Sequence, residues 1–320
     1  MDETVKLMQA HLDNLTKPRG SLGKLEDYCL KMARIQNKVP PEITKKSIYV
    51  FAGDHGIAAE GVSLYPQEVS RQMALNMFSG GAGINALSLR TGWELNVVDA
   101  GLLGDDFPPD SELKPSCNFI RNRITNGSKN FYHQSAMTET ETETAIEKGK
   151  ELARSCTSDL TAIGDLGIGN TSTAAAMIIA AGFDADKIID RGTGIDDKML
   201  EHKRKVIIES VKRRGGVRKD GKIILRELGS PDFAMMTGFI LGLEGRACVL
   251  DGFPVTSAAY MAYLINPKVT DRLFAGHLSK VAGHKPVLDA LGLDPIVRLD
   301  MHLGEGTGAV IGGYIIELGV

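Results

Sequence analysis

The sequence predicts an α/β protein in which helices flank a mainly parallel, Rossmann-like sheet. Short β-branched runs alternate with longer helical patterns along most of the chain. Each run ends in Gly, Asp or His, and many of the 36 glycines gather at these ends. Glycine suits tight strand-to-helix turns, and the alternation implies right-handed crossovers between parallel strands.

Five apolar runs are predicted to be buried strands: 47–53, 93–101, 160–167, 246–252 and 272–277. The patterns between them predict helices at Pro66–Phe78, Thr138–Cys156, Thr171–Ala181, Lys198–Arg213 and Thr256–Leu264. Ligands of such sheets bind beyond the carboxyl ends of the strands, where the glycine-rich turns of this chain fall.

The two ends of the chain depart from this alternation. The first 45 residues predict two helices, roughly Glu3–Leu15 and Leu22–Gln36, without a strand. We therefore expect residues 46–288 to form a large α/β domain that holds the ligand site. Residues 1–45 and 289–320 are expected to form a small helical lobe that contributes a glycine-rich loop. Residues 108–115 predict a surface loop, and the acidic run 138–144 predicts a solvated helix start.

The composition excludes several classes of protein. Hydrophobic residues make up 43% and charged residues 24%, as in ordinary globular domains, and the net charge of -3 provides no basic surface for nucleic acid or membrane. The N-terminus lacks the apolar core of a signal peptide, and the chain lacks an apolar run long enough for a membrane helix. Four cysteines without C-x-x-C spacing are interpreted as reduced structural thiols. A soluble cytoplasmic protein is expected.

Residues 164–173 are the first candidate for binding chemistry. This segment, GDLGIGNTST, follows a predicted strand and opens an alanine-rich helix. Gly167 and Gly169 would allow the backbone to approach a ligand, and a side chain among Asn170, Thr171 and Ser172 could cap the helix, whose N-terminus attracts anions. A monophosphate site and a plain tight turn both fit. Lys203 could supply a cation, although a surface lysine is the default interpretation.

Other candidate side chains lie at loops and strand ends. Glu305 stands among glycines in LGEGTGA, where a desolvated carboxylate could act as a base or a solvated one could simply occupy a surface turn. Asp54 and His55 end the first strand, and without a second ligand cluster at metal spacing they do not predict a metal site. Asp251 and His277 occupy equivalent strand ends, where structural roles are common. Asp251 is retained as a candidate substrate-binding residue.

Nine segments together resemble the nicotinate-nucleotide:dimethylbenzimidazole phosphoribosyltransferase family, which makes the lower ligand of cobamides. They are KPRGSLGKLE (17–26), FAGDHGIAAEGVSLYPQEV (51–69), GGAGINALS (80–88), VVDAGL (97–102), GDLGIGNTSTAAA (164–176), GTGIDD (192–197), MTGFILG (236–242), VLDGF (249–253) and LGEGTGA (303–309). The segments keep the family order and span nearly the whole chain, so the combined match is specific although each piece alone is weak.

The resemblance implies a function and a set of site residues. A Rossmann-like enzyme would move ribose 5-phosphate from nicotinate mononucleotide to an aromatic base, with Glu305 as the general base. Asp165 and the backbone around Gly167–Thr171 would hold the nucleotide, and Lys203 would contact its phosphate. Tyr65 and Met73 match positions that line the base pocket. The resemblance implies neither a metal nor an organic cofactor. It does imply a homodimer.

Two departures from the family pattern keep alternatives open. The family usually has Glu where this chain has Asp165, and Arg where it has His302. Some relatives transfer the same group to phenol or p-cresol as a pair of related subunits, so a phenolic acceptor and a heterodimer with a paralogue remain alternatives. A third is a non-catalytic paralogue, which the intact Glu305 argues against. An NAD-dependent reductase is disfavoured because the turn at 164–173 lacks the third glycine of G-x-G-x-x-G.

Overall fold

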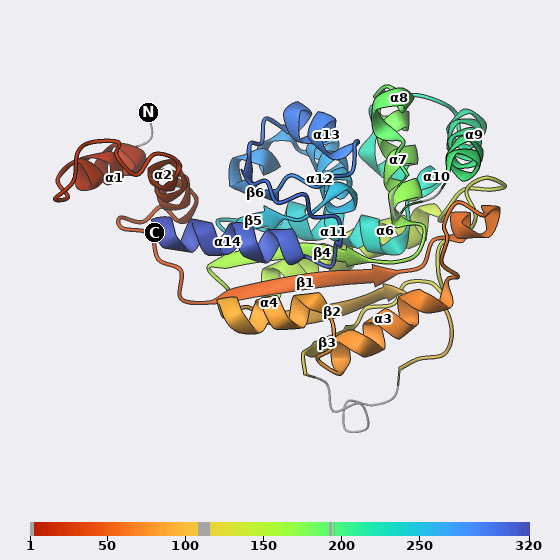
Figure 1. The fold of residues 1–320 in the computed structure, drawn as a ribbon, viewed down its shortest axis with the longest axis horizontal. Helices are drawn as coiled ribbons and strands as arrows, with labels where there is room; N and C mark the ends of the chain where they lie inside the picture. Colours follow the sequence, from red (N-terminus) through yellow and green to blue (C-terminus); the bar gives the residue numbers. More distant parts are fainter. Residues whose placement is uncertain (1–2, 108–115, 192–193, 195) are drawn as a thin grey trace.

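A computed structural model describes residues 3–107, 116–191, 194 and 196–320. Its centre is one seven-stranded sheet of order β3-β2-β1-β4-β5-β6-β7, in which every pair of neighbours is parallel (Figure 1). The strands are β1 (Lys46–Gly53), β2 (Glu94–Gly101), β3 (Asn118–Arg121), β4 (Leu160–Leu166), β5 (Ala247–Leu250), β6 (Leu273–His277) and β7 (Pro295–Val297). The predicted Rossmann-like parallel sheet is confirmed. The five predicted strands are present within a few residues, whereas β3 and β7 were not predicted.

The helices follow the strands along the chain. They are α1 (Glu3–Asp13), α2 (Lys24–Gln36), η1 (Gly56–Glu60), α3 (Glu68–Phe78), α4 (Gly83–Thr91), α6 (Glu139–Ser155), α7 (Asn170–Ala180), α8 (Ala185–Ile188), α9 (Asp197–Arg213), α10 (Gly221–Leu228), α11 (Pro231–Gly242), α12 (Phe253–Ile265), η2 (Pro267–Arg272), α13 (His284–Leu291) and α14 (Thr307–Gly319). The acidic run does begin a helix, because Thr138 caps α6 and exchanges hydrogen bonds with Glu141. Within the described residues, no helix combines the length and apolar character needed to cross a membrane.

Both faces of the sheet are covered, which explains why the strands are apolar without alternation. All eight residues of β1 are buried. Phe51 packs into a core shared with α6, α7 and α10–α13, while Val50 on the opposite face packs into a core shared with α3, α4 and α14. The four cysteines are free thiols, as expected.

The chain ends meet at the amino ends of the strands (Figure 1). Helix α2 packs on both α1 and α14, so the two terminal segments do contact each other. However, β7 belongs to the main sheet, and α14 packs directly on β4, β5 and β6. The division into a domain of residues 46–288 and a lobe of residues 1–45 and 289–320 stays a prediction. The predicted loop 108–115 lies outside the described residues.

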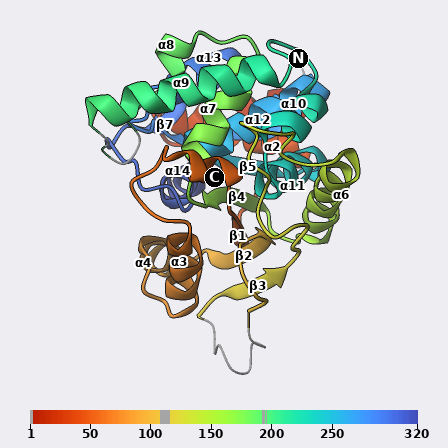
Figure 2. The same ribbon diagram turned by 90° about the vertical axis from the view of Figure 1, so that its right-hand side faces the viewer.

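The strand order reverses between β1 and β4. After β1 the chain turns to one face of the sheet to form α3 and α4, and after β4 it turns to the other face to form α7. In sheets of this kind the crevice beyond the carboxyl ends at such a reversal is where ligands bind. Figure 2 looks onto this end of the strands and shows α9 lying across α7 there. The glycine-rich turn after β4 and the turn after β1 therefore meet at the predicted position.

Candidate active site

The turn after β4 is packed tightly against the turn after β1. A side chain at Gly167 would place its Cβ 1.9 Å from the carbonyl oxygen of Gly53, so only glycine fits there. Gly169 adopts a left-handed φ of 97°, and a Cβ there would lie 3.0 Å from the His55 side chain. These glycines are thus required by packing against residues 53–55. Their approach to a ligand stays a prediction.

Helix α7 begins differently from our expectation. The N-cap residue is Gly169, and no side chain caps the helix, so the predicted capping by Asn170, Thr171 or Ser172 was wrong. With the left-handed Gly169 as N-cap, the helix begins at Asn170, one residue before the predicted start at Thr171. Asn170 instead donates from Nδ2 to Asp165, and its Oδ1 accepts the N–H of Thr171 at 2.7 Å. Ser172 is buried in the first turn.

Lys203 reaches this helix start from α9. It is only 3% exposed, so the default interpretation as a surface lysine was wrong. Its Nζ donates to the carbonyl oxygen of Asp190 at 3.1 Å and lies 3.5 Å from Thr171 Oγ1. Burial lowers the pKa of Lys203 to about 8, and the carboxylate of Asp190 partly opposes this effect. An anion bound beside Nζ would restore the usual pKa, so the site favours anionic groups.

Glu305 is the central residue of a strained loop before α14. It has a φ of 62° between Gly304 at 84° and Gly306 at 85°, so three successive residues are left-handed. For a residue with a Cβ this conformation costs about 1–2 kcal/mol. The side chain is 5% exposed, and Oε2 has no hydrogen-bond partner among the described residues. The alternative of a solvated carboxylate on a surface turn was therefore wrong.

The electrostatic surroundings increase the proton affinity of the Glu305 carboxyl. Burial raises the pKa of its carboxyl above the usual value, and the negative charge of Asp251 adds to this. The backbone N–H of Ile84, at the start of α4, partly offsets both effects. A carboxylate with a raised pKa and a free oxygen is a stronger proton acceptor than an ordinary one.

Asp251 follows β5 and holds this loop by its backbone. Oδ2 accepts the N–H of Gly306 at 2.9 Å, while Oδ1 accepts those of Gly308 at 2.8 Å and Ala309 at 3.2 Å. The Nε2 atom of His277 lies 3.4 Å from Oδ1. Burial would raise the pKa of Asp251, but His277 and the loop N–H groups outweigh burial and keep it low. In this structure Asp251 thus anchors the loop; a direct contact with substrate stays a prediction.

Asp165, at the end of β4, is a second buried carboxyl in the same region. It is 3% exposed, and Oδ1 has no partner among the described residues. Burial raises its pKa to about 8; Asn170 opposes this, whereas the charges of Asp251, Asp232 and Glu305 add to it. Asp165 therefore carries its proton for much of the time at neutral pH.

Asp232, near the start of α11, was missed by sequence reasoning. It is fully buried, its Oδ1 accepts a hydrogen bond from Ser230, and its Oδ2 lies 3.6 Å from His55 Nε2. The signal was present as a lone acidic residue in an otherwise apolar segment, PDFAMMTGFILG. A buried acidic side chain of this kind is rare without a partner or a function.

The remaining predicted residues differ in how deeply they are buried. Asp54 and His55 are buried, and Asp54 accepts hydrogen bonds from Ser70 Oγ at 2.6 Å and from the N–H of Leu103 at 2.9 Å. They shape the turn after β1. By contrast, Tyr65 is half exposed, and Met73 on α3 packs at the edge of the core that includes α14. His302 is exposed and lies near the Glu305 loop, with Nδ1 3.2 Å from the Asp300 carbonyl oxygen.

The described residues contain no group of three or more His, Cys, Asp or Glu side chains that could hold a metal ion. A cavity of about 10 Å³ lies between Thr171 and Lys203, lined also by Asp190 and Phe253. This is room for about one water molecule.

The class of protein is a Rossmann-like α/β fold with buried carboxyls at the strand ends, one of which, Asp165, is hydrogen-bonded to Asn170 in the first turn of α7. A family model described as phosphoribosyltransferase matches residues 1–320. The chain is 42% identical over 318 residues to the nicotinate-nucleotide–dimethylbenzimidazole phosphoribosyltransferase of Citrifermentans bemidjiense, covering 98% of this chain and 89% of that protein. It is 41% identical over 308 residues to the Thermus thermophilus enzyme of that name, covering 94% of this chain and 89% of that protein.

Solved structures agree with these relatives. The crystal structure of CobT from Thermus thermophilus superimposes with a TM-score of 0.92 at 38% identity, covering 99% of this chain and 95% of that one. A structure of the nicotinate-nucleotide–dimethylbenzimidazole phosphoribosyltransferase from the same organism gives a TM-score of 0.91 at 37% identity, covering 100% and 95%. The chain belongs to the nicotinate-nucleotide–dimethylbenzimidazole phosphoribosyltransferase family. The resemblance found in the sequence is confirmed.

Proposed function

We propose that this chain transfers ribose 5-phosphate from nicotinate mononucleotide to 5,6-dimethylbenzimidazole or a similar lower-ligand base. The products are nicotinate and an α-ribazole phosphate for cobamide synthesis. The names of the relatives support this reaction. The observation that carries it is the buried Glu305 carboxyl, which has a raised pKa and one oxygen without a partner among the described residues.

The donor phosphate is assigned to the start of α7. Gly169 begins this helix just beyond the carboxyl end of β4, and the positive end of the helix dipole attracts an anion there. Lys203 and Thr171 stand on the same side of the helix start. The phosphate does not change during the reaction, so these contacts position the donor without taking part in bond breaking.

Glu305 is assigned as the general base. The incoming benzimidazole attacks the anomeric carbon through one ring nitrogen, and the bond from that carbon to nicotinate breaks. The other ring nitrogen of the benzimidazole loses its proton to Glu305. A base placed in this way contributes about 10²–10⁴-fold to the rate. Nicotinate leaves as a neutral ring because its nitrogen is cationic in the nucleotide.

The ionised Asp251 near Glu305 stabilises positive charge in the transition state. As the bond to nicotinate breaks, the ribose ring gains positive charge while Asp251 stays ionised beside the loop. Fixed groups of opposite sign stabilise developing charge without reorganising, which is usually a large part of catalysis. Asp165, whose pKa is about 8, serves as a hydrogen-bond donor or acceptor to the aromatic base.

The acceptor and the assembly belong to the same proposal. A phenol ionises near pH 10 in water, so a phenolic acceptor demands stronger coupling between proton loss and attack than a benzimidazole does. We propose the benzimidazole acceptor, a dimeric assembly as the resemblance implies, and a cytoplasmic location. The free state of Cys29, Cys117, Cys156 and Cys248 supports a reducing compartment.

A nicotinate-release assay tests the proposed function. Purified chain is mixed with nicotinate mononucleotide and either 5,6-dimethylbenzimidazole or phenol, and wild type is compared with Glu305→Gln. We expect turnover with the benzimidazole and a loss of about 10²–10⁴-fold in the variant. Turnover with phenol alone would instead assign the protein to the phenol-using branch. Absence of turnover with both acceptors would contradict the proposal and favour a subunit that acts only with a paralogue.

A further inference from the structure

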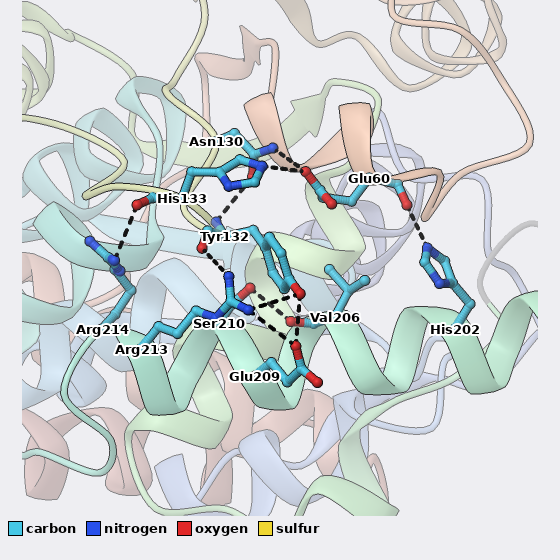
Figure 3. Close-up of polar contacts among 10 residues, drawn as sticks. All are labelled: Glu60, Asn130, Tyr132, His133, His202, Val206, Glu209, Ser210, Arg213 and Arg214. Atoms are coloured by element: carbon cyan, nitrogen blue, oxygen red, sulfur yellow. Dashed lines mark hydrogen bonds and ion pairs between the residues drawn. The ribbon is translucent and has the colours of Figure 1, made fainter.

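Helix α9 carries Lys203 and lies across α7 (Figure 2). Its buried side consists of Lys203, Val206, Ile207, Ser210 and Val211. This side packs on α7, while polar side chains on α9 contact the turns beyond β1 and β3 (Figure 3). The position of Lys203 therefore depends on both the packed side and these polar contacts.

His202, the residue next to Lys203, makes one of these contacts. Its Nε2 lies 2.6 Å from the carbonyl oxygen of Glu60, so this nitrogen carries the hydrogen and donates it (Figure 3). Glu60 ends the short helix η1, which directly follows β1 and His55. The His202 side chain is exposed, yet it joins α9 to the turn that underlies the glycine-rich loop.

Glu60 is itself held in place. Its Oε1 accepts hydrogen bonds from Asn130 Nδ2 at 2.6 Å and from His133 Nε2 at 3.0 Å. The acceptor of the His202 hydrogen bond is therefore part of a fixed network.

A second anchor holds the same helix near its other end. Tyr132 donates from its hydroxyl to Glu209 at 2.7 Å, and Arg213 stacks over the Tyr132 ring at 3.9 Å (Figure 3). Residues 202 and 209 are seven positions apart, or about 10 Å along a helix. One support, made of Glu60 and residues 130–133, thus holds α9 at two separate points.

We propose that His202 is a positioning residue for Lys203, an inference that rests on the function proposed above. A helix moves as a rigid rod, so a displacement at His202 is passed on to its neighbour. Lys203 Nζ stands 3.5 Å from Thr171 Oγ1, and binding sites tolerate displacements of only about 0.5 Å. The bond between His202 and Glu60 keeps the cation at the distance at which it meets the donor phosphate.

Three variants of the full chain test this role. His202→Ala removes the donor, His202→Gln retains an N–H that can reach the Glu60 carbonyl, and Glu201→Ala alters an exposed neighbour on the same helix. We expect His202→Ala to raise KM for nicotinate mononucleotide about 3- to 10-fold, as the loss of one hydrogen bond implies, with kcat within about twofold. The Gln variant should regain most of the wild-type KM, and Glu201→Ala should resemble wild type.

A second measurement does not depend on turnover. The rate at which acetic anhydride labels Lys203 in the substrate-free protein, followed by mass spectrometry, should rise in His202→Ala and not in Glu201→Ala. Unchanged KM and unchanged labelling in His202→Ala, or a loss confined to kcat, would overturn the inference. If wild type releases no nicotinate, the proposed function fails, while the labelling rates still decide whether His202 positions Lys203.

Discussion

Asp251→Asn tests how the loop that carries Glu305 is held. The carboxylate accepts three backbone N–H groups, one on Oδ2 and two on Oδ1. An asparagine side chain can keep one acceptor oxygen. In its better orientation the oxygen faces Gly308 and Ala309, and the amide NH₂ faces the N–H of Gly306. That N–H, directly after Glu305, then remains buried without an acceptor.

The size of the effect follows from these contacts. A buried donor without a partner costs about 1–3 kcal/mol, and two hydrogen bonds weakened from charged to neutral cost about 1 kcal/mol each. We therefore expect a loss of about 3–5 kcal/mol in the free energy of unfolding, or roughly 5–10 °C in Tm. Displacement of the loop by about 1 Å should lower kcat/KM about 10²-fold.

The pH dependence provides a readout that instability alone would not move. The charge of Asp251 raises the pKa of Glu305, and Asp165, Asp232, His277 and His284 also face this region. His284 stays neutral, because burial lowers its pKa to about 3. Without the charge of Asp251 the pKa of Glu305 falls, so the acid limb of the kcat/KM profile should move to lower pH.

Asp159→Asn is the matched control. Its Oδ2 accepts the backbone N–H groups of Thr44 at 2.8 Å and Lys45 at 2.9 Å, at the opposite end of the sheet. The assays are thermal unfolding and nicotinate release between about pH 5 and pH 9, a window in which the acid limb of a base with a raised pKa can be followed. If Asp251→Asn lost no more activity than Asp159→Asn, or kept the wild-type acid limb, our account of the loop would be refuted.

Three further predictions address the rest of the site. Lys203→Met should raise KM for nicotinate mononucleotide about 10- to 100-fold, the value of one charged hydrogen bond, with a smaller change in kcat; equal KM values would count against the phosphate assignment. Gly164→Ala should destabilise the protein by about 1–3 kcal/mol and impair turnover, because its Cβ would lie 2.4 Å from Gly306 N; Gly252→Ala, whose nearest contact is 3.9 Å, should do neither. The folded pKa of Asp165 is about 8, above the unfolded value of 3.8, so its stabilising contribution is present below about pH 4 and is lost as the pH rises through 8. Asp165→Asn should therefore gain Tm relative to wild type as the pH is raised, and a constant difference in thermal scans would contradict this.

Much of the fold could be predicted because local pattern and final structure agree. Central strands such as β1 and β4 are buried on both faces, so their sequences are continuous apolar runs. The two missed strands are the sheet edges: β3 has four residues, and β7 has three and begins with proline. Helix α11 was not predicted because it is apolar on nearly all sides and so lacks a helical period.

The candidate site could be predicted only as separate pieces. The sequence singled out Glu305, Asp251 and Lys203 by their glycine neighbours, their strand ends or the family pattern, but not their environments. Lys203 is buried by the fold of α9 onto α7, and Glu305 is buried by contacts with α4 and β4. Asp251 binds the loop backbone although more than fifty residues separate them in the sequence, so the order of residues alone does not predict this contact. Asp232 was missed although it is the lone acidic residue of an apolar segment, because the sequence does not reveal its contact with His55.

The features that make this site reactive also make it costly to fold. Glu305 occupies a left-handed conformation, has an oxygen without a partner, and lies near a second carboxyl, Asp165, whose pKa is raised by burial. Each of these features lowers stability. The ionised anchor of Asp251 and the glycines on either side of Glu305 offset part of that cost by fixing the backbone on both sides of the base. The backbone of the loop is therefore held rigidly, while one carboxyl oxygen of Glu305 has no hydrogen-bond partner among the described residues. Our proposal assigns proton transfer to this oxygen.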